Sequence, residues 1–169
     1  MKNKFIILLI LISGCAINLT PNYTSTTSNV QTIDRSYDAV WSKLVDFLAN
    51  EGIAIKILDK ESGLMVSEVY SFKNTYTRLN KDGKLENPAA YVVIGNLKGG
   101  FGNRLEPHRI DGNFNVRVKR VGDGQTEITV NLVNLVSTYQ NPPNVGGGVI
   151  NIGIKTTGSF EQKILQYLK

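Results

Sequence analysis

The first fifteen residues constrain this chain most, because they set aside a segment that does not join the fold. Lys2 and Lys4 give a basic start, and an unbroken apolar run occupies residues 5–12. A helix that spans a bilayer needs about 20 apolar residues, so this run is too short to cross a membrane. A basic start, a short apolar run and small residues before a cleavage point are typical of a secretory signal peptide. We therefore predict a signal peptide over residues 1–14.

The end of the apolar run resembles the lipobox of bacterial lipoproteins. The residues there are, in order, Ile12, Ser13, Gly14 and Cys15. The resemblance implies that a signal peptidase recognises Ile12, Ser13 and Gly14. It also implies cleavage after Gly14, a diacylglycerol linked to the sulfur of Cys15, and acylation of the new amino terminus. Each buried CH₂ group of an acyl chain contributes about 0.8 kcal/mol, so two or three chains hold a protein firmly in a membrane.

The residue after the cysteine bears on where the anchored protein lies. In lipoproteins of Gram-negative bacteria an aspartate there is the usual signal for retention in the inner membrane, and this chain has Ala16. The resemblance therefore favours the outer membrane, with the protein facing the periplasm and attached through the Cys15 lipid. An ordinary signal peptide with a chance cysteine, or a buried amino-terminal strand, is the alternative.

The composition fits one domain with a tail. The chain has 169 residues, of which 41% are apolar, and this is enough for a core. Removal of Lys2 and Lys4 leaves 17 basic against 14 acidic residues, a net charge of +3, which is too weak and scattered to favour nucleic acid. Cys15 is the only cysteine, so no disulfide and no cysteine metal site is expected. We predict no cofactor.

Residues 15–29 and 30–169 differ in character. The first stretch is rich in Thr, Ser and Asn, and it is predicted to be a flexible tether from lipidated Cys15. The second stretch is predicted to be a single α+β domain. Its expected contact surface is either the exposed face of the sheet or the loops at 96–112 and 141–158, because loops of this length usually function or move.

Two amphipathic helices are predicted in the domain. The first begins after Ser36 as N-cap and ends before Gly52, and its apolar stripe contains Trp41, which we assign to the core rather than to ligand stacking. The second follows a capping box made by Ser159 and Gln162. The apolar residues on the two stripes are Tyr37, Val40, Trp41, Leu44 and Leu48, then Phe160, Ile164 and Leu168.

Alternating apolar residues predict the strands. They fall at 30–33, in a hairpin over 53–70, at 91–94, from 114 to the turn at 122–124 and at 126–138, while 149–154 is either an edge strand or a partly ordered loop. The apolar phase changes between Leu132 and Val133, which predicts a bulge or a switch to burial on both faces. We predict the order β-α-β-β-β-β-β-α, an antiparallel sheet of five to six strands with two helices packed on one face.

Residues 37–70 resemble the repeated module of BamC-type lipoproteins, which are accessory proteins of the outer-membrane β-barrel assembly machine. The residues that carry the resemblance are Tyr37, Asp38, Val40, Trp41, Leu44, Leu48, Gly52, Ile55, Asp59, Lys60, Ser62, Gly63, Leu64 and Tyr70. They form a Trp-bearing helix, a strand, an acidic turn ending in Ser-Gly, and a second strand. The resemblance implies a single module of that fold and an accessory role.

Candidate chemical groups are few. His108 is the only histidine and lies in a glycine-rich stretch, so a solvated loop residue is favoured over a catalytic one. Asp59 and Glu61 fit a turn better than an acid–base pair. Arg104 and Arg109 flank His108 as an anion site or as a solvated loop. No catalytic residue and no metal ligand is predicted.

Three functions follow from these patterns. The first is a membrane-anchored, non-catalytic envelope lipoprotein that acts as an assembly, scaffold or accessory protein through protein–protein contacts. The second is a carrier of a small apolar ligand held between sheet and helices, with Trp41, Phe47, Tyr91 and Phe114 lining the cavity. A cell-wall hydrolase that uses His108 is the weakest of the three.

Overall fold

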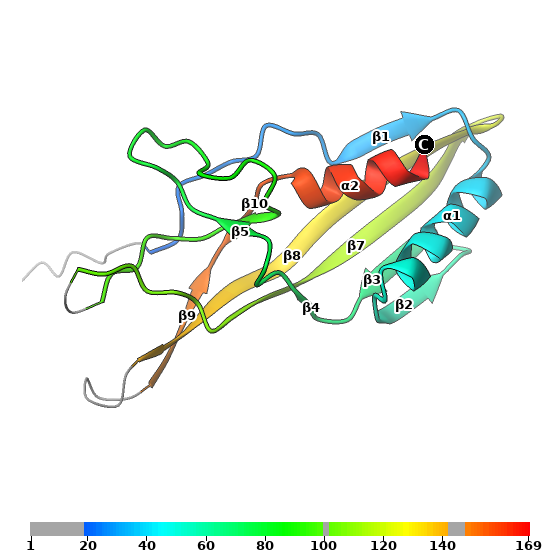
Figure 1. The fold of residues 1–169 in the computed structure, drawn as a ribbon. Coiled ribbons are helices and arrows are strands. Elements are labelled where there is room, and N and C mark those ends of the chain that lie inside the picture. The colour runs from blue at the N-terminus through cyan, green and yellow to red at the C-terminus, as the bar shows by residue number, and fades with distance from the viewer. Residues whose placement is uncertain (1–18, 100–101, 142–147) are drawn as a thin grey trace, which may run out of the picture.

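The computed structural model describes residues 19–99, 102–141 and 148–169, so the predicted signal peptide, the lipobox-like residues 12–14 and Cys15 lie outside the described residues. The fold is α+β, with two helices packed against an antiparallel sheet of seven strands (Figure 1). The elements are β1 (Val30–Ile33), α1 (Tyr37–Asn50), β2 (Ile55–Asp59), β3 (Leu64–Ser67), β4 (Tyr70–Ser71), β5 (Tyr76–Thr77), β6 (Val92–Val93), β7 (Arg109–Gly122), β8 (Gln125–Asn141), β9 (Gly148–Gly153), β10 (Lys155–Thr156) and α2 (Ser159–Leu168).

The hairpin of β7 and β8 is the centre of the sheet. Its turn includes Gly124, whose φ of 75° is a conformation that glycine adopts without strain. β3 and β4 pair along the outer edge of β7, β2 pairs with β3, and β1 and β9 pair along the outer edge of β8. The sheet has seven strands rather than five to six, because the predicted second strand of the early hairpin divides into β3 and β4 and residues 149–154 join as part of β9, whereas the predicted strand at 91–94 lies outside it.

The predicted bulge in β8 is confirmed. Asp111 of β7 pairs with Val136, whereas Asn113 pairs with Val133, so β8 has one extra residue at this point. Asn134 absorbs it with a φ of 54°. The bulge turns Leu135 over Gly112, where a Cβ atom would lie 2.6 Å from the leucine Cδ2. The apolar face of β8 therefore continues past the change of phase.

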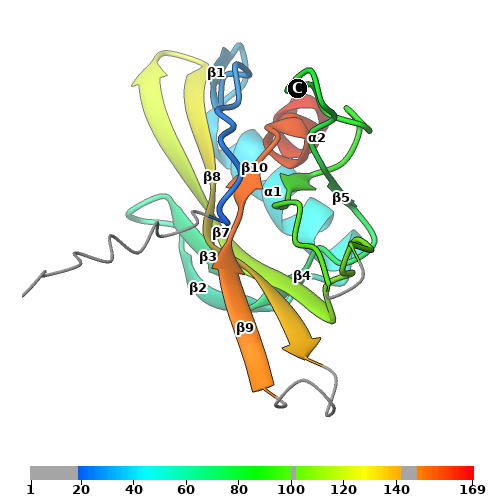
Figure 2. The same cartoon turned by 90° about the vertical axis from the view of Figure 1, so that its left-hand side faces the viewer.

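Both helices lie on the same face of the sheet (Figure 2). Trp41 is 6% exposed and stacks on Tyr37 with ring centroids 6.1 Å apart, which confirms its assignment to the core. The stripe of α2 is buried as predicted. The Phe160 ring lies at its centre, with centroids 5.0 to 5.9 Å from those of Tyr70, Phe72, Tyr91 and Phe114.

The strand predicted at 91–94 does not join the main sheet. Instead β6 pairs in parallel with β5 and antiparallel with β10, in a separate three-stranded sheet. The predicted loop 96–112 also ends early, because β7 begins at Arg109 and its next residue, Ile110, is fully buried. The alternation that marks the strand therefore starts before Phe114.

The start of α2 differs from the predicted capping box. Gly158 is the N-cap, and the hydroxyls of Thr156 and Thr157 accept the N–H groups of Gly158 and Ser159 at 2.9 and 3.2 Å. Ser159 donates its hydroxyl to the carbonyl of Pro88 instead. The prediction was wrong because the hydroxyls of two threonines before the helix accept these N–H groups. In a capping box the acceptor would instead be the side chain of Gln162, inside the helix.

Candidate functional site

The amino-terminal segment, defined as residues 19–29, lies against the body of the domain (Figure 1). Pro21 is buried, and the Ser25 hydroxyl donates to the carbonyl of Thr157 at 2.8 Å. Asn29 donates to the side-chain oxygen of Asn131 at 2.7 Å. Within the stretch 15–29 predicted to be a flexible tether, the side chains of Ser25 and Asn29 therefore bond to the body of the domain.

The segment covers an interruption along the outer edge of β8. β1 pairs with residues 126–129 of β8, and β9 pairs with residues 136–141. Along this outer edge, none of the described strands pairs with residues 131–135. The bulge lies in this interval, so the edge changes direction where its two partner strands separate.

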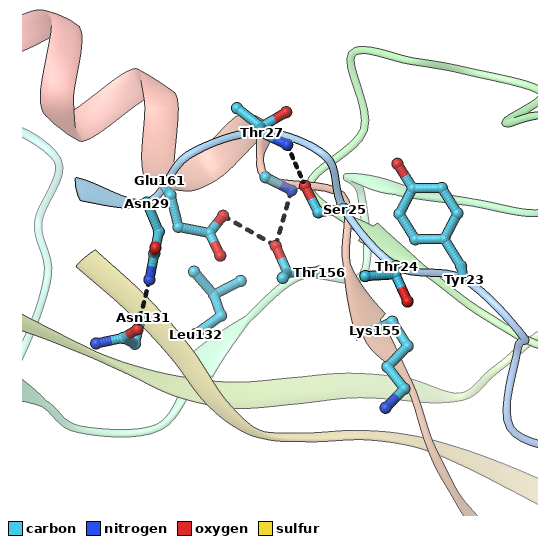
Figure 3. A pocket seen from close by; sticks show the side chains of 11 residues that line it. Tyr23, Thr24, Ser25, Thr27, Asn29, Asn131, Leu132, Lys155, Thr156 and Glu161 are labelled. Atoms are coloured by element: carbon cyan, nitrogen blue, oxygen red, sulfur yellow. Dashed lines mark hydrogen bonds between the residues drawn. The ribbon is translucent and has the colours of Figure 1, made fainter. Parts of the chain in front are cut away.

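A hollow of about 340 Å³ lies at this interruption (Figure 3). Hydroxyl and amide groups dominate its lining, which also holds one carboxylate and one lysine. The lining residues are Tyr23, Thr24, Ser25, Thr27, Asn29, Asn131, Leu132, Lys155, Thr156, Gly158 and Glu161.

Glu161 is the buried ionisable group of the hollow. Its side chain comes from the first turn of α2, and the residue is 3% exposed. The Thr156 hydroxyl donates to Glu161 Oε2 at 2.9 Å. Burial raises the pKa of this carboxyl group, and hydrogen bonds from Thr156 and from the backbone N–H groups of Glu161 and Leu132 oppose the increase. The carboxyl group thus accepts the Leu132 N–H at a point where none of the described strands pairs with the outer edge of β8.

A helical pattern could have revealed Glu161. It precedes Ile164 by three residues and Leu165 by four, so it lies on the apolar stripe of α2. A carboxylate on such a stripe is seldom buried without partners. The partners themselves were not predictable, since β8 and the residues before α2 meet it only through the tertiary fold.

The predicted loop groups are not brought together into a catalytic or anion site. His108 is exposed, and its backbone N–H donates to the carbonyl of Thr138 at 2.7 Å. Arg104 pairs with Glu86 at 3.0 Å, and Arg109 pairs with Asp111 at 2.7 Å. Each guanidinium group is therefore neutralised by its own carboxylate.

The acidic turn after β2 has the structural role that the sequence favoured. Asp59 Oδ1 accepts the N–H groups of Glu61 and Ser62 at 3.0 and 3.2 Å. These hydrogen bonds lower the pKa of Asp59, with the bonds from Ser62 the largest cause. The carboxylate thus holds the turn in shape.

The four aromatic residues proposed to line an apolar cavity lie in packed surroundings. Phe114 and Tyr91 both contact the Phe160 ring, at centroid distances of 5.0 and 5.3 Å. Phe47 packs on Tyr167 at 5.2 Å, and Trp41 stacks on Tyr37 as described above. This arrangement does not favour an apolar ligand between the sheet and the helices.

Searches for a metal site, for a membrane-spanning helix and for known relatives gave no positive result for the described residues or the sequence. No group of His, Cys, Asp and Glu among residues 19–99, 102–141 and 148–169 is arranged to hold a metal ion. Neither helix in this described part is long and apolar enough to cross a membrane. Comparison of the chain with protein-family models and with curated proteins gave no match in either case. The likeness to BamC-type lipoproteins therefore stays a prediction from residues 37–70.

Proposed function

We propose that this chain is a membrane-anchored envelope lipoprotein without catalytic activity, which acts as an assembly, scaffold or accessory protein. Its anchor is the lipid on Cys15, and its place is the outer membrane on the periplasmic side. The complete lipobox at residues 12–15 supports the anchor. The likeness of residues 37–70 to an accessory module supports the role.

The observation that carries the protein–protein contact is the ribbon, defined as β9 and the part of β8 that pairs with it. The ribbon projects from the body beyond the two helices (Figures 1 and 2). The outer edge of β9 pairs with none of the described strands. Val149 on this strand is 63% exposed. An unpaired edge of this kind accepts an extended segment of a partner as an added strand.

The position of the ribbon also agrees with a contact region predicted from the sequence. It overlaps the stretch 141–158, which the sequence marked as a contact loop. The end of β9 at Gly153 approaches the amino-terminal segment, where a Cβ atom would lie 3.7 Å from the Thr20 hydroxyl. Further along the strand, Val149 and Asn151 are exposed, and this part of the edge is the one we assign to the partner.

Site-specific photocrosslinking in the native host tests the contact. A photoreactive residue in place of Val149 is expected to give an adduct of discrete mass with an envelope protein. Val69 is the matched control, because it is apolar and 62% exposed but lies between β3 and β4. Adducts of equal yield at both positions, or none at Val149, would contradict the contact through the ribbon.

Mass spectrometry of the same protein, isolated from host membranes, tests the anchor. We expect the chain to begin at Cys15 and to have the added mass of a diacylglycerol and an acyl chain. A protein that keeps residues 1–14 and remains in the cell interior would overturn the anchor, whatever the crosslinking shows.

A further inference from the structure

We propose that the hairpin at residues 79–85 and the bridged pair of segments 97–99 and 102–105, called here the two hairpins, form a docking face for the surface of an anionic lipid bilayer. This face orients the ribbon relative to the membrane, so the inference deepens the proposed function and rests on its anchor at Cys15. It depends on where the amino-terminal segment meets the body, on what surrounds that point, and on which charges are available there.

The amino-terminal segment meets the body beside β6. A Cβ atom on Gly95 would overlap the Leu19 carbonyl oxygen, so the two backbones are in close contact. A second hollow, of about 300 Å³, extends from Leu19 to Leu79 and Asn96. Since Pro21 is buried, the chain is fixed to the body from this point onward.

The distance from this point to the lipid is short. Four residue steps separate Cys15 from Leu19, and a chain spans at most about 3.6 Å per residue. Leu19 therefore lies within roughly 14 Å of the Cys15 lipid, whatever path the chain takes. A tether of this length lets the body tilt but does not let it turn another side to the membrane.

The two hairpins beside Leu19 form one unit. Bridges join Leu79 to Leu85 in the first and Lys98 to Arg104 in the second. Arg104 pairs with Glu86 at 3.0 Å, and Asn96 donates its side-chain amide to the carbonyl of Leu79 at 3.2 Å. These contacts hold the hairpins together at the end of the molecule that lies opposite the β7–β8 turn (Figure 1).

The charges on this unit suit an anionic surface. Lys81, Lys84 and Lys98 are exposed, and no carboxylate of the described residues lies within ion-pair distance of them. Asp82 is the acidic residue of the first turn, while Glu86 is neutralised by Arg104. Exposed lysines within a Debye length of anionic headgroups are attracted to them. The tether keeps the hairpins that carry these three lysines on the side of the body that faces the membrane.

Tethering the processed chain, Cys15–Lys169, to vesicles tests the face independently of the host. Cys15 is the only thiol, so a maleimide lipid in vesicles of phosphatidylethanolamine and phosphatidylglycerol attaches the protein at its native position. A water-soluble amine-acylating reagent, read out by peptide mass spectrometry, then measures the exposure of each lysine. We expect Lys81, Lys84 and Lys98 to react several-fold more slowly than in the untethered chain. Lys56 and Lys119, exposed on β2 and β7, should keep their reactivity.

Two variants separate the short tether from the attraction of the lysines. A flexible linker of about 20 Gly and Ser residues after Ala16 gives the body a reach of roughly 25 Å. Protection is expected to persist with this linker on anionic vesicles and to disappear on phosphatidylcholine. It should also disappear on anionic vesicles when K81Q, K84Q and K98Q are added to the linker variant, whose folding is checked by circular dichroism.

Several results would overturn the docking face. Uniform protection of all lysines, or protection of Lys56 and Lys119 instead, would place another surface on the membrane. Loss of protection with the long linker on anionic vesicles would show that the lysines do not bind headgroups. Neither result touches the anchor itself, which is tested by the mass of the protein from its host.

Discussion

The two ends of the molecule are held together by different interactions. At one end α1 and α2 cover the sheet with an apolar core, in which the Phe160 ring contacts four other aromatic rings. At the other end the β5–β6–β10 sheet also buries Val92, Val93 and the adjacent Ile154, while the amino-terminal segment is joined to the body by hydrogen bonds such as those of Ser25 and Asn29. The helix-covered end depends on removing apolar surface from water, whereas the amino-terminal segment depends largely on satisfying polar groups.

This difference predicts unequal stability. Burying a large apolar side chain contributes about 1.5–3 kcal/mol, whereas a typical hydrogen bond contributes about 1 kcal/mol net. The helix-covered end should therefore open only on global unfolding, and the amino-terminal segment should open first. If Cys15 carries the proposed lipid, this segment lies between the anchor and the body, and its contacts would set how far the body moves from the membrane.

The largest effect is expected from Phe160→Ala. The change removes a fully packed ring that contacts Tyr70, Phe72, Tyr91 and Phe114, and truncations of this kind cost about 3–5 kcal/mol. Urea unfolding followed by circular dichroism measures the loss. Tyr167→Ala is the control on the same helix, because Tyr167 is 41% exposed. Equal losses in the two variants would mean that the aromatic cluster is not the centre of the core.

The next largest effect is a difference in stability loss between alanine substitutions of two glycines, one at each end, that share the same backbone conformation. Gly63 has a φ of 70° in the β2–β3 turn, and Gly83 has a φ of 75° in the first hairpin of the docking face. A Cβ atom on Gly63 would overlap the Val118 carbonyl oxygen, whereas nothing lies within 4 Å of one on Gly83. Gly83→Ala should cost about 1–2 kcal/mol from the left-handed backbone alone. Gly63→Ala should cost roughly 2–5 kcal/mol, because the clash adds to that strain.

Thermal unfolding of both glycine variants measures the difference. Glycine-to-alanine changes at the two sites alter the unfolded chain alike, so the unfolded state contributes little to the comparison. A Gly63 variant as stable as the Gly83 variant would contradict the close approach of the β2–β3 turn to β7.

The same contrast explains which elements were predictable. α1, the early hairpin, the β7–β8 pair and its bulge all follow from apolar periodicity within one segment, as at Ile128 and Val130. The β5–β6–β10 sheet follows from no such pattern, because it pairs Tyr76 with Val92 and Lys155 with Val93 across long separations. Strands of two residues leave no periodicity to read, so the apolar run at 91–94 indicated a strand but not its partners.

The candidate site was predictable to a smaller extent. The likeness of residues 12–15 to a lipobox depends on local order alone and stays a prediction. The hollow at Glu161 was missed, since its lining comes from the amino-terminal segment, β8 and the start of α2. The Ser- and Thr-rich composition of the segment indicated a solvated tether, but hydroxyls such as that of Ser25 find carbonyl partners that only the fold supplies.

Two glutamates are expected to change the stability of the fold with pH in opposite directions, Glu161 in the hollow and Glu106 in the loop before β7. Burial raises the pKa of Glu161 above its ordinary value of 4.5, so the folded state holds this proton more tightly than the unfolded chain. Its stabilising contribution is complete below the ordinary value and is lost as the pH rises through the raised pKa. Glu106 behaves in the opposite way, because hydrogen bonds from Tyr76 and Arg78 lower its pKa. Its contribution is present above the ordinary value and is lost as the pH falls.

E161Q and E106Q measure these two contributions against the wild type by urea unfolding between pH 4 and pH 8. The wild type should gain stability relative to E161Q on acidification and lose stability relative to E106Q. The glutamine of E161Q keeps an acceptor for the Leu132 N–H, so the change removes mainly the buried charge. Slopes of the same sign for both variants would contradict the burial of Glu161 or the pairing of Glu106.

The smallest effect is expected in the amino-terminal segment. Ser25→Ala removes the hydrogen bond to the Thr157 carbonyl, which contributes about 1 kcal/mol, and should speed hydrogen exchange in the segment without changing global unfolding. Ser28→Ala is the matched control, because the Ser28 hydroxyl bonds only to Val30 two residues away. Faster exchange in Ser25→Ala alone would show that this bond holds the segment to the body. Equal exchange in both variants would mean that other contacts, such as the burial of Pro21, hold it instead, and the amino-terminal segment would then be as firmly fixed as the helix-covered end.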